Sequence, residues 1–164
     1  MEYLLLTCTI FALATGVNSA SVYVQKRFKV YDRWRHGWVM HTTLILPAWI
    51  VFLYLLVNLN DHYQLTITSS PVIGYFLYGL AALLFTLSIR AIGLQALANG
   101  NWFGRGKITH SGVYKIAKNP IYISYLLMFT GAGLTSGNAA YFIIALESFI
   151  GLNIIESHIE QIKE

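Results

Sequence analysis

Residues 112–122 read GVYKIAKNPIY and stand between two strongly apolar regions of the chain. Proline fixes its own φ near the helical value and disfavours helical geometry in the residue before it. Pro120 therefore predicts a helix that starts directly after a non-helical Asn119. A tyrosine on each side flanks a pair of lysines in the same stretch. The pattern predicts a basic, aromatic loop that runs into a membrane helix, where a polar ligand can meet lipid.

The composition indicates that lipid surrounds most of the chain. Of its 164 residues, 56% are hydrophobic and 11% are charged, and the mean hydropathy is +0.57. Soluble domains usually carry about 25% charged residues. At this length we expect a single membrane domain, residues 1–164. The lone Cys8 and five scattered histidines offer no internal disulfide and no metal-ligand spacing, so we expect no metal.

Five apolar segments predict membrane helices, at residues 3–24, 37–57, 72–97, 121–135 and 139–157. The first has no basic residues before it, which favours a span over a signal peptide. The last two are short and are joined by the tetrapeptide TSGN, which predicts a tight helical hairpin. The small residues Gly131 and Gly133 indicate close helix–helix approach there. The expected fold class is all-α: a polytopic membrane protein with about five transmembrane helices.

The basic residues are distributed unevenly between the loops. Five Lys or Arg lie in residues 25–36 and four in residues 98–118, whereas residues 58–70 contain none. The positive-inside rule then places the N-terminus outside, and the loop 98–120 and the C-terminus in the cytoplasm. Because the charge lies beside apolar spans, we expect membrane lipid and no nucleic acid as its partner. Recruitment of a substrate is an alternative role for residues 25–36.

Several polar residues in the predicted helices have a structural and a functional interpretation. His41 is either a hydrogen-bonded interfacial residue or a catalyst. Glu147 is either a paired carboxyl facing the bundle or part of a ligand cavity. Near the chain end, Glu156, Glu160 and Glu164 follow one another at i+4 spacing. They form either a solvated helix end or a carboxylate stripe that could hold the ammonium of a zwitterion.

The order of features in the last part of the chain is distinctive. Gly112-Val113-Tyr114 comes first, then Lys118-Asn119-Pro120-Ile121-Tyr122, then an apolar hairpin and an acidic end. From about residue 90 onward, this order resembles the isoprenylcysteine carboxyl methyltransferase and phospholipid methyltransferase group of integral membrane enzymes. The resemblance implies an S-adenosylmethionine-dependent methyltransferase. Its acceptor would be lipophilic or lipidated, either isoprenylcysteine carboxylate-like or phospholipid-like.

Carried over residue by residue, the resemblance implies a set of cofactor-binding positions. They are Lys107, Ile108, Thr109, Tyr114, Lys118, Asn119, Pro120, Ile121, Tyr122 and Glu164. Lys118 stands where the family has Arg, and Lys cannot offer a carboxylate the bidentate fork of Arg. No catalytic residue is assigned: a carboxylate acceptor needs no base. For an amine acceptor, the candidates are His158 and Glu160.

Two alternatives remain at this point. The family continues beyond the position of Glu164 with a second Glu and a cytoplasmic tail that helps to form the acceptor site. One alternative is therefore a non-enzymatic, truncated family member. The other is an NADPH-dependent membrane sterol or enone reductase, since that class ends with a similar Arg-His-Pro-Asn-Tyr motif. Ile121 stands where that class has Asn, which counts against it.

The topology generates a direct test. Cysteines placed at His62 and Lys107 should react with impermeant thiol reagents from opposite sides of sealed vesicles, because the basic loops stay in the cytoplasm. Labelling of both positions from the same side would contradict the five-span topology and the shared cytoplasmic site.

Overall fold

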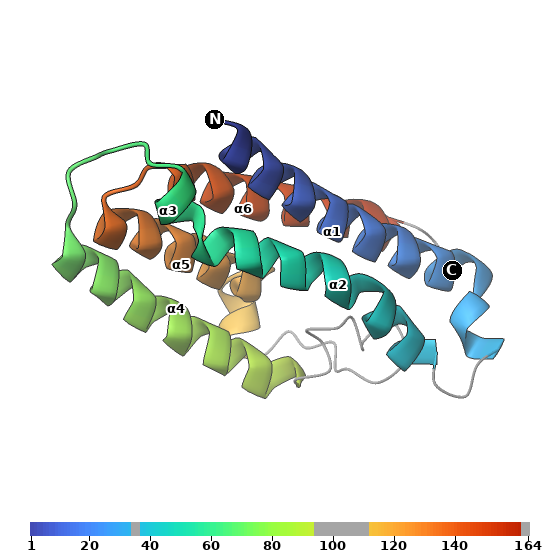
Figure 1. The fold of residues 1–164 in the computed structure, drawn as a ribbon. Coiled ribbons are helices and arrows are strands. Elements are labelled where there is room, and N and C mark those ends of the chain that lie inside the picture. Colours follow the sequence, from blue (N-terminus) through green and yellow to red (C-terminus); the bar gives the residue numbers. More distant parts are fainter. Residues whose placement is uncertain (34–36, 94–111, 162–164) are drawn as a thin grey trace.

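The long apolar segments form α-helices in the computed structural model, which describes residues 1–33, 37–93 and 112–161 (Figure 1). The elements in chain order are α1 (Glu2–Phe28), η1 (Val30–Arg33), α2 (Gly37–Val57), α3 (Leu59–His62), α4 (Pro71–Ile92), η4 (Gly112–Lys115), α5 (Pro120–Ser136) and α6 (Ala140–Gln161). These residues contain no β-strand, only an isolated bridge between Thr66 and Asn138. The predicted all-α fold class is confirmed.

Within the described residues, three helical segments are long and apolar enough to cross a membrane: α1, Val39–Val57 of α2, and α4. Helices α5 and α6 are shorter in this respect. Helix α5 has 17 residues, and the apolar part of α6 is Ala140–Ile154. Gly137, with a φ of 69°, ends α5 in the left-handed conformation that glycine adopts readily. Helix α6 begins three residues later, so the predicted hairpin is confirmed. The chain is an integral membrane protein.

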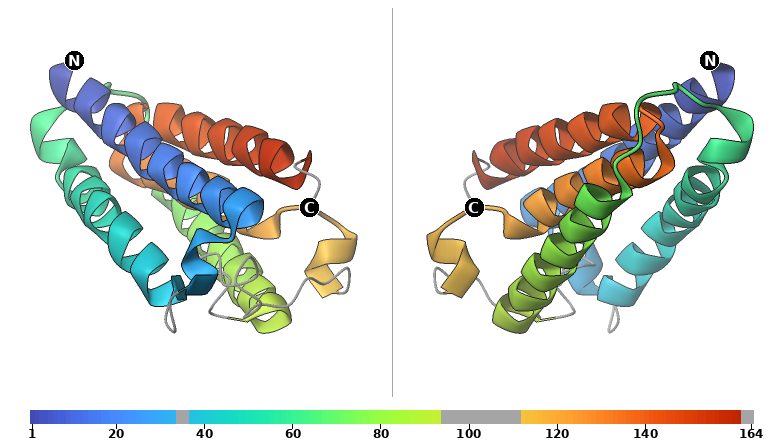
Figure 2. Two further views of the ribbon diagram at one scale, coloured as in Figure 1. Left: turned by 90° about the vertical axis from the view of Figure 1, so that its right-hand side faces the viewer. Right: turned by 90° about the vertical axis from the view of Figure 1, so that its left-hand side faces the viewer.

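The helices pack in an open row. Helix α4 packs on α5, α5 on α6, α6 on α1, and α1 on α2. Helices α2 and α4 stand at the two ends of this row, and Figure 2 shows their ribbons apart from each other. Helix α3, the start of α1 and the α5–α6 turn share one end of the molecule, which we call the turn end (Figure 1). The start of α5 and the last turns of α6 lie at the other end, which we call the motif end.

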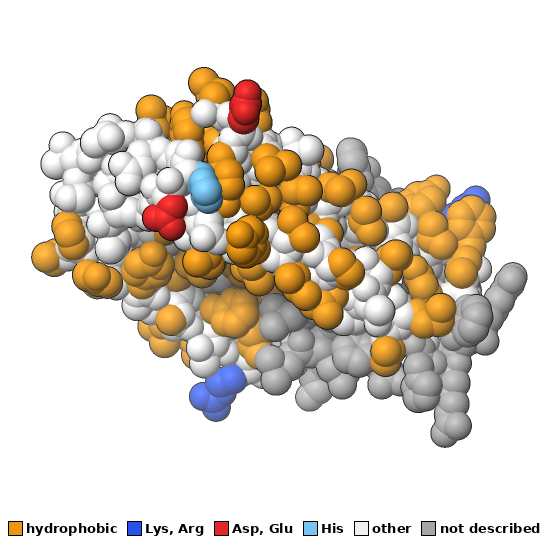
Figure 3. Space-filling view, in the orientation of Figure 1, with side chains coloured by type: hydrophobic (Ala, Val, Ile, Leu, Met, Phe, Trp, Pro, Cys, Tyr) orange, Lys and Arg blue, Asp and Glu red, His pale blue; other side chains and the backbone are white. Residues whose placement is uncertain are grey.

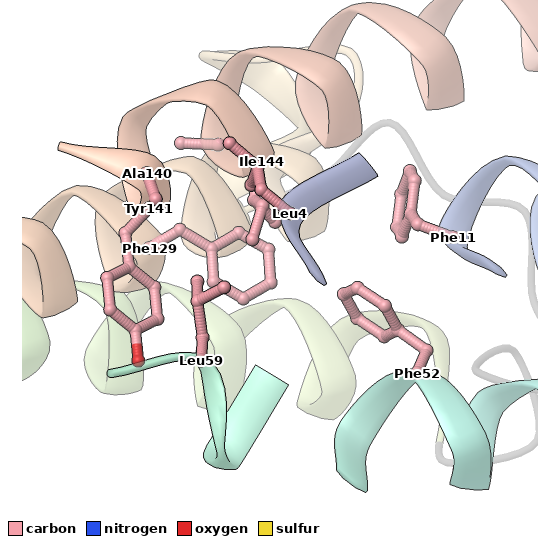
Figure 4. Close-up of a cluster of buried hydrophobic side chains, with 9 residues drawn as sticks. Leu4, Phe11, Phe52, Leu59, Phe129, Ala140, Tyr141 and Ile144 are labelled. Atoms are coloured by element: carbon pink, nitrogen blue, oxygen red, sulfur yellow. The ribbon is translucent and has the colours of Figure 1, made fainter. Parts of the chain in front are cut away.

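A cluster of buried side chains joins the row near the turn end (Figure 4). Its members are Leu4 and Phe11 of α1, Phe52 of α2, Leu59 of α3, Phe129 of α5, and Ala140, Tyr141, Ile144 and Ala145 of α6. The ring centroids of Phe11 and Phe52 lie 5.1 Å apart. Such aromatic pairs add stability beyond the area they bury. No residue of α4 belongs to this cluster, so α4 is held through its contact with α5.

Helices α4 and α5 approach closely through glycines, as the sequence indicated. A Cβ atom added to Gly74 would lie 2.8 Å from the carbonyl oxygen of Gly131. A Cβ added to Gly131 would lie 2.9 Å from the carbonyl oxygen of Gly74. Small residues let backbones meet in this way where lipid supplies little hydrophobic driving force for helix association.

Asn138 holds the turn end together. Its Oδ1 accepts hydrogen bonds from the backbone N–H of Leu65 (3.0 Å) and Ala140 (3.1 Å). Its Nδ2 donates to Oδ1 of Asn60 (2.9 Å) and to the carbonyl of Tyr63 (2.8 Å). The side chain is 1% exposed, so water does not compete for these groups. The amide therefore fastens the α5–α6 turn to the segment between α3 and α4.

Asn138→Ala should lower the free energy of unfolding by about 3 kcal/mol, because it leaves several buried polar groups without partners. Unfolding in mixed detergent micelles measures this loss. The matched control is Ser136→Ala, since Ser136 is exposed and bonds only the Ala132 carbonyl of its own helix (2.7 Å). Equal losses in the two variants would contradict the role given to Asn138.

Candidate active site

The stretch 112–122 folds as a short helical turn followed by the start of α5. η4 spans Gly112–Lys115, and Gly112 has a φ of 60°. The N–H groups of Ile116 and Ala117 both donate to the carbonyl of Val113 (3.1 Å each). These bonds tighten the backbone just before the proline. η4 also packs against α4, so the loop is supported from the side.

The junction at Asn119 and Pro120 follows the sequence prediction. Asn119 has φ −126° and ψ 70°, which is not helical, and Pro120 is the first residue of α5. The backbone carbonyl of Asn119 accepts the N–H groups of Tyr122 (3.1 Å) and Ile123 (3.3 Å). Pro120 is buried, and its missing N–H costs nothing at a helix start.

A hydrogen bond between side chains ties this junction to the last helix. Nδ2 of Asn119 donates to Oδ1 of Asn153 at 2.9 Å, across 34 residues of sequence. Nδ2 of Asn153 donates in turn to the carbonyl of Phe149 at 2.6 Å. The start of α5 and the last turns of α6 are therefore joined by a specific contact at the motif end.

Some of the predicted cofactor residues lie in the described part of the chain and some lie outside it. Those in the described part belong to one continuous segment, the motif 112–122. Tyr114 lies in η4, Lys118 is exposed just before the junction, and Ile121 and Tyr122 are half-buried in the first turn of α5. Lys107, Ile108, Thr109 and Glu164 lie outside the described residues. His158 and Glu160 lie on α6, but their side chains are outside the description.

The charges differ between the two ends of the bundle. On the face drawn in Figure 3, acidic side chains lie near the N-terminus and α3, and apolar side chains cover the middle. Basic side chains on this face lie away from that acidic end. Arg90 is exposed in the last turn of α4, and Lys115 and Lys118 are exposed in and just after η4, which packs on α4. A ligand at this loop would meet basic side chains.

His41 belongs to a separate polar cluster between α1 and α2. It is fully buried, and its Nδ1 lies 2.8 Å from Oγ of Ser21. That hydroxyl lies 2.6 Å from the hydroxyl of Tyr31. One helical turn further on, Gln25 donates to Asp32 at 2.6 Å. These contacts support the hydrogen-bonded interpretation of His41.

Glu147 lies against α1 and not beside the motif. Its carboxyl contacts the thiol of Cys8, and Oε2 is buried without a hydrogen-bond partner among the described residues. Glu147 precedes Asn153 on α6 by more than one turn.

The sequence analysis did not identify Asn153 as a site residue. The available signal was an amide inside an otherwise apolar helix, since such polar groups need partners in lipid.

The sequence model of the phospholipid methyltransferase family matches residues 69–162. The chain belongs to the phospholipid methyltransferase family. No curated protein and no solved structure matches it.

The model of the phospholipid methyltransferase family covers the chain from just before α4 to the end of the described residues. It includes η4, the Asn119–Pro120 junction and the whole hairpin, and it excludes α1 and α2. The resemblance predicted from the sequence is confirmed at the level of the family. The chain is a member of a class of membrane methyltransferases.

Proposed function

We propose that the protein transfers a methyl group from S-adenosylmethionine to a lipid-embedded acceptor at the cytoplasmic face of the membrane. The observation that carries this proposal is the hydrogen bond from Asn119 to Asn153. It joins the Asn-Pro-x-Tyr segment, where the resemblance places the methyl donor, to the helix that leads to the acidic chain end. The family match favours methyl transfer over reduction with NADPH.

The residue types at the motif end suit a zwitterionic donor. The carboxylate of the donor would meet Lys118, and its ammonium the acidic end of α6. The half-buried Tyr122, in the first turn of α5, adds an aromatic ring and a hydroxyl to the motif. S-adenosylmethionine would supply a methyl group activated by its sulfonium. The protein then contributes position and electrostatics, which are the main requirements of an in-line displacement.

The acceptor would reach this end from the lipid. Helix α4, which supports η4, exposes apolar side chains along its length: Leu80, Leu83 and Leu87. A lipid tail can lie along such a surface while its head group reaches the loop. An isoprenylcysteine carboxylate is already a nucleophile, whereas a phospholipid amine must lose a proton. His158 and Glu160 are the candidates for that proton transfer.

Asn119→Ala should weaken S-adenosylmethionine binding about ten- to a hundredfold, because a hydrogen bond to a charged ligand contributes roughly 1.5–3 kcal/mol. Calorimetric titration of the purified protein measures the change. Asn58→Ala is the matched control, since Asn58 lies at the turn end and bonds only the carbonyl of Tyr54 (2.8 Å). Equal binding by Asn119→Ala and the unmodified protein would contradict the proposed role of the motif.

A further inference from the structure

The side chain of Asn119 does not do what asparagine usually does at its position. It is the residue directly before α5, where an Asn side chain normally accepts a backbone N–H of the first helical turn. The structure shows no such bond from its side chain. The backbone carbonyl of Asn119 takes the N–H groups of Tyr122 and Ile123. The side chain instead reaches across to α6.

The partner on α6 is fixed in its orientation. The carbonyl of Phe149 can only accept, so the group of Asn153 that lies 2.6 Å from it must be the amide nitrogen. Oδ1 of Asn153 then faces Asn119. Asn119 must present its own nitrogen to that oxygen, at 2.9 Å, and this turns its Oδ1 away from α6. The backbone of α6 thus determines which way the amide of Asn119 points.

We propose that Asn153 is a positioning residue, which holds Asn119 so that Oδ1 of Asn119 is presented to the methyl donor as a hydrogen-bond acceptor. This inference rests on the proposed function. Asn119 then accepts a hydrogen bond from an N–H or ammonium group of the donor. Without Asn153, the Asn119 amide is free to rotate or to return to the first turn of α5.

Because the side chain of Asn119 can bond the first turn of α5 instead, a variant at position 153 can test the proposal without loss of the fold. Asn119 would exchange its bond to α6 for an ordinary cap of α5. The hairpin stays fastened at the turn end through Asn138, far along the helices from Asn153. A variant at Asn153 should therefore change ligand binding more than thermal stability.

The experiment measures the dissociation constant of S-adenosylmethionine and the melting temperature for the unmodified protein and a set of variants in detergent micelles. Asn153→Leu removes the acceptor and should weaken binding about tenfold with little change in melting temperature. Asn153→Asp keeps an oxygen facing Asn119 in either protonation state and should bind nearly as the unmodified protein does. Asn153→Ala replaces the leucine variant if that one does not fold.

The double variant Asn119→Ala/Asn153→Leu should bind no more weakly than Asn119→Ala alone, because Asn153 acts through Asn119. Ser148→Ala is the control on the same helix, since Ser148 is buried and bonds only the carbonyl of Ala145 (2.9 Å). It should leave binding unchanged.

Three results would overturn the inference. They are unchanged binding in Asn153→Leu, binding in Asn153→Asp as weak as in Asn153→Leu, or losses of binding free energy from Asn119→Ala and Asn153→Leu that add in the double variant. Failure of the unmodified protein to bind S-adenosylmethionine would instead overturn the proposed function. The two failures are therefore distinguishable.

Discussion

A buried turn between two helices must satisfy its polar backbone within the protein, because water does not reach it. Asn138 meets this constraint at the α5–α6 turn, and neighbouring backbone bonds complete it. The N–H of Ile67 donates to Gly137 (2.9 Å), and that of Ala139 donates to Leu65 (2.8 Å). The segment before α4 thereby closes over the turn. Without this closure the hairpin would have buried polar groups without partners at this end.

The fixed turn determines what happens at the far end of the hairpin. One short turn joins the end of α5 to the start of α6, so the two helices run antiparallel. The start of α5 and the end of α6 must therefore lie together. The Asn119–Asn153 bond sets their alignment there. The buried cluster joins the hairpin to α1 and α2 near the turn end. The buried cluster and the proposed ligand site therefore lie toward opposite ends of the molecule.

The sequence predicted those features that depend on local rules. Hydropathy located the helices, Pro120 predicted both the start of α5 and the non-helical Asn119, and the glycines of α5 predicted a close helix–helix approach. Contacts between distant residues could not be predicted in this way. Asn138 finds partners more than 70 residues away, and Asn153 finds Asn119 across 34. Nothing in the local sequence around either amide specifies its partner. All the predicted site residues stay predictions, and Lys107 to Thr109 and Glu164 lie outside the described residues.

Transfer of a labelled methyl group tests the central claim most directly. The protein is reconstituted in vesicles that contain phospholipid and a prenylcysteine acceptor, and S-adenosylmethionine with a labelled methyl is added. The account predicts that label enters the lipid fraction and that addition of S-adenosylhomocysteine, the product left after transfer, suppresses it. Absence of label from every acceptor, together with oxidation of NADPH in the presence of a membrane enone, would contradict it.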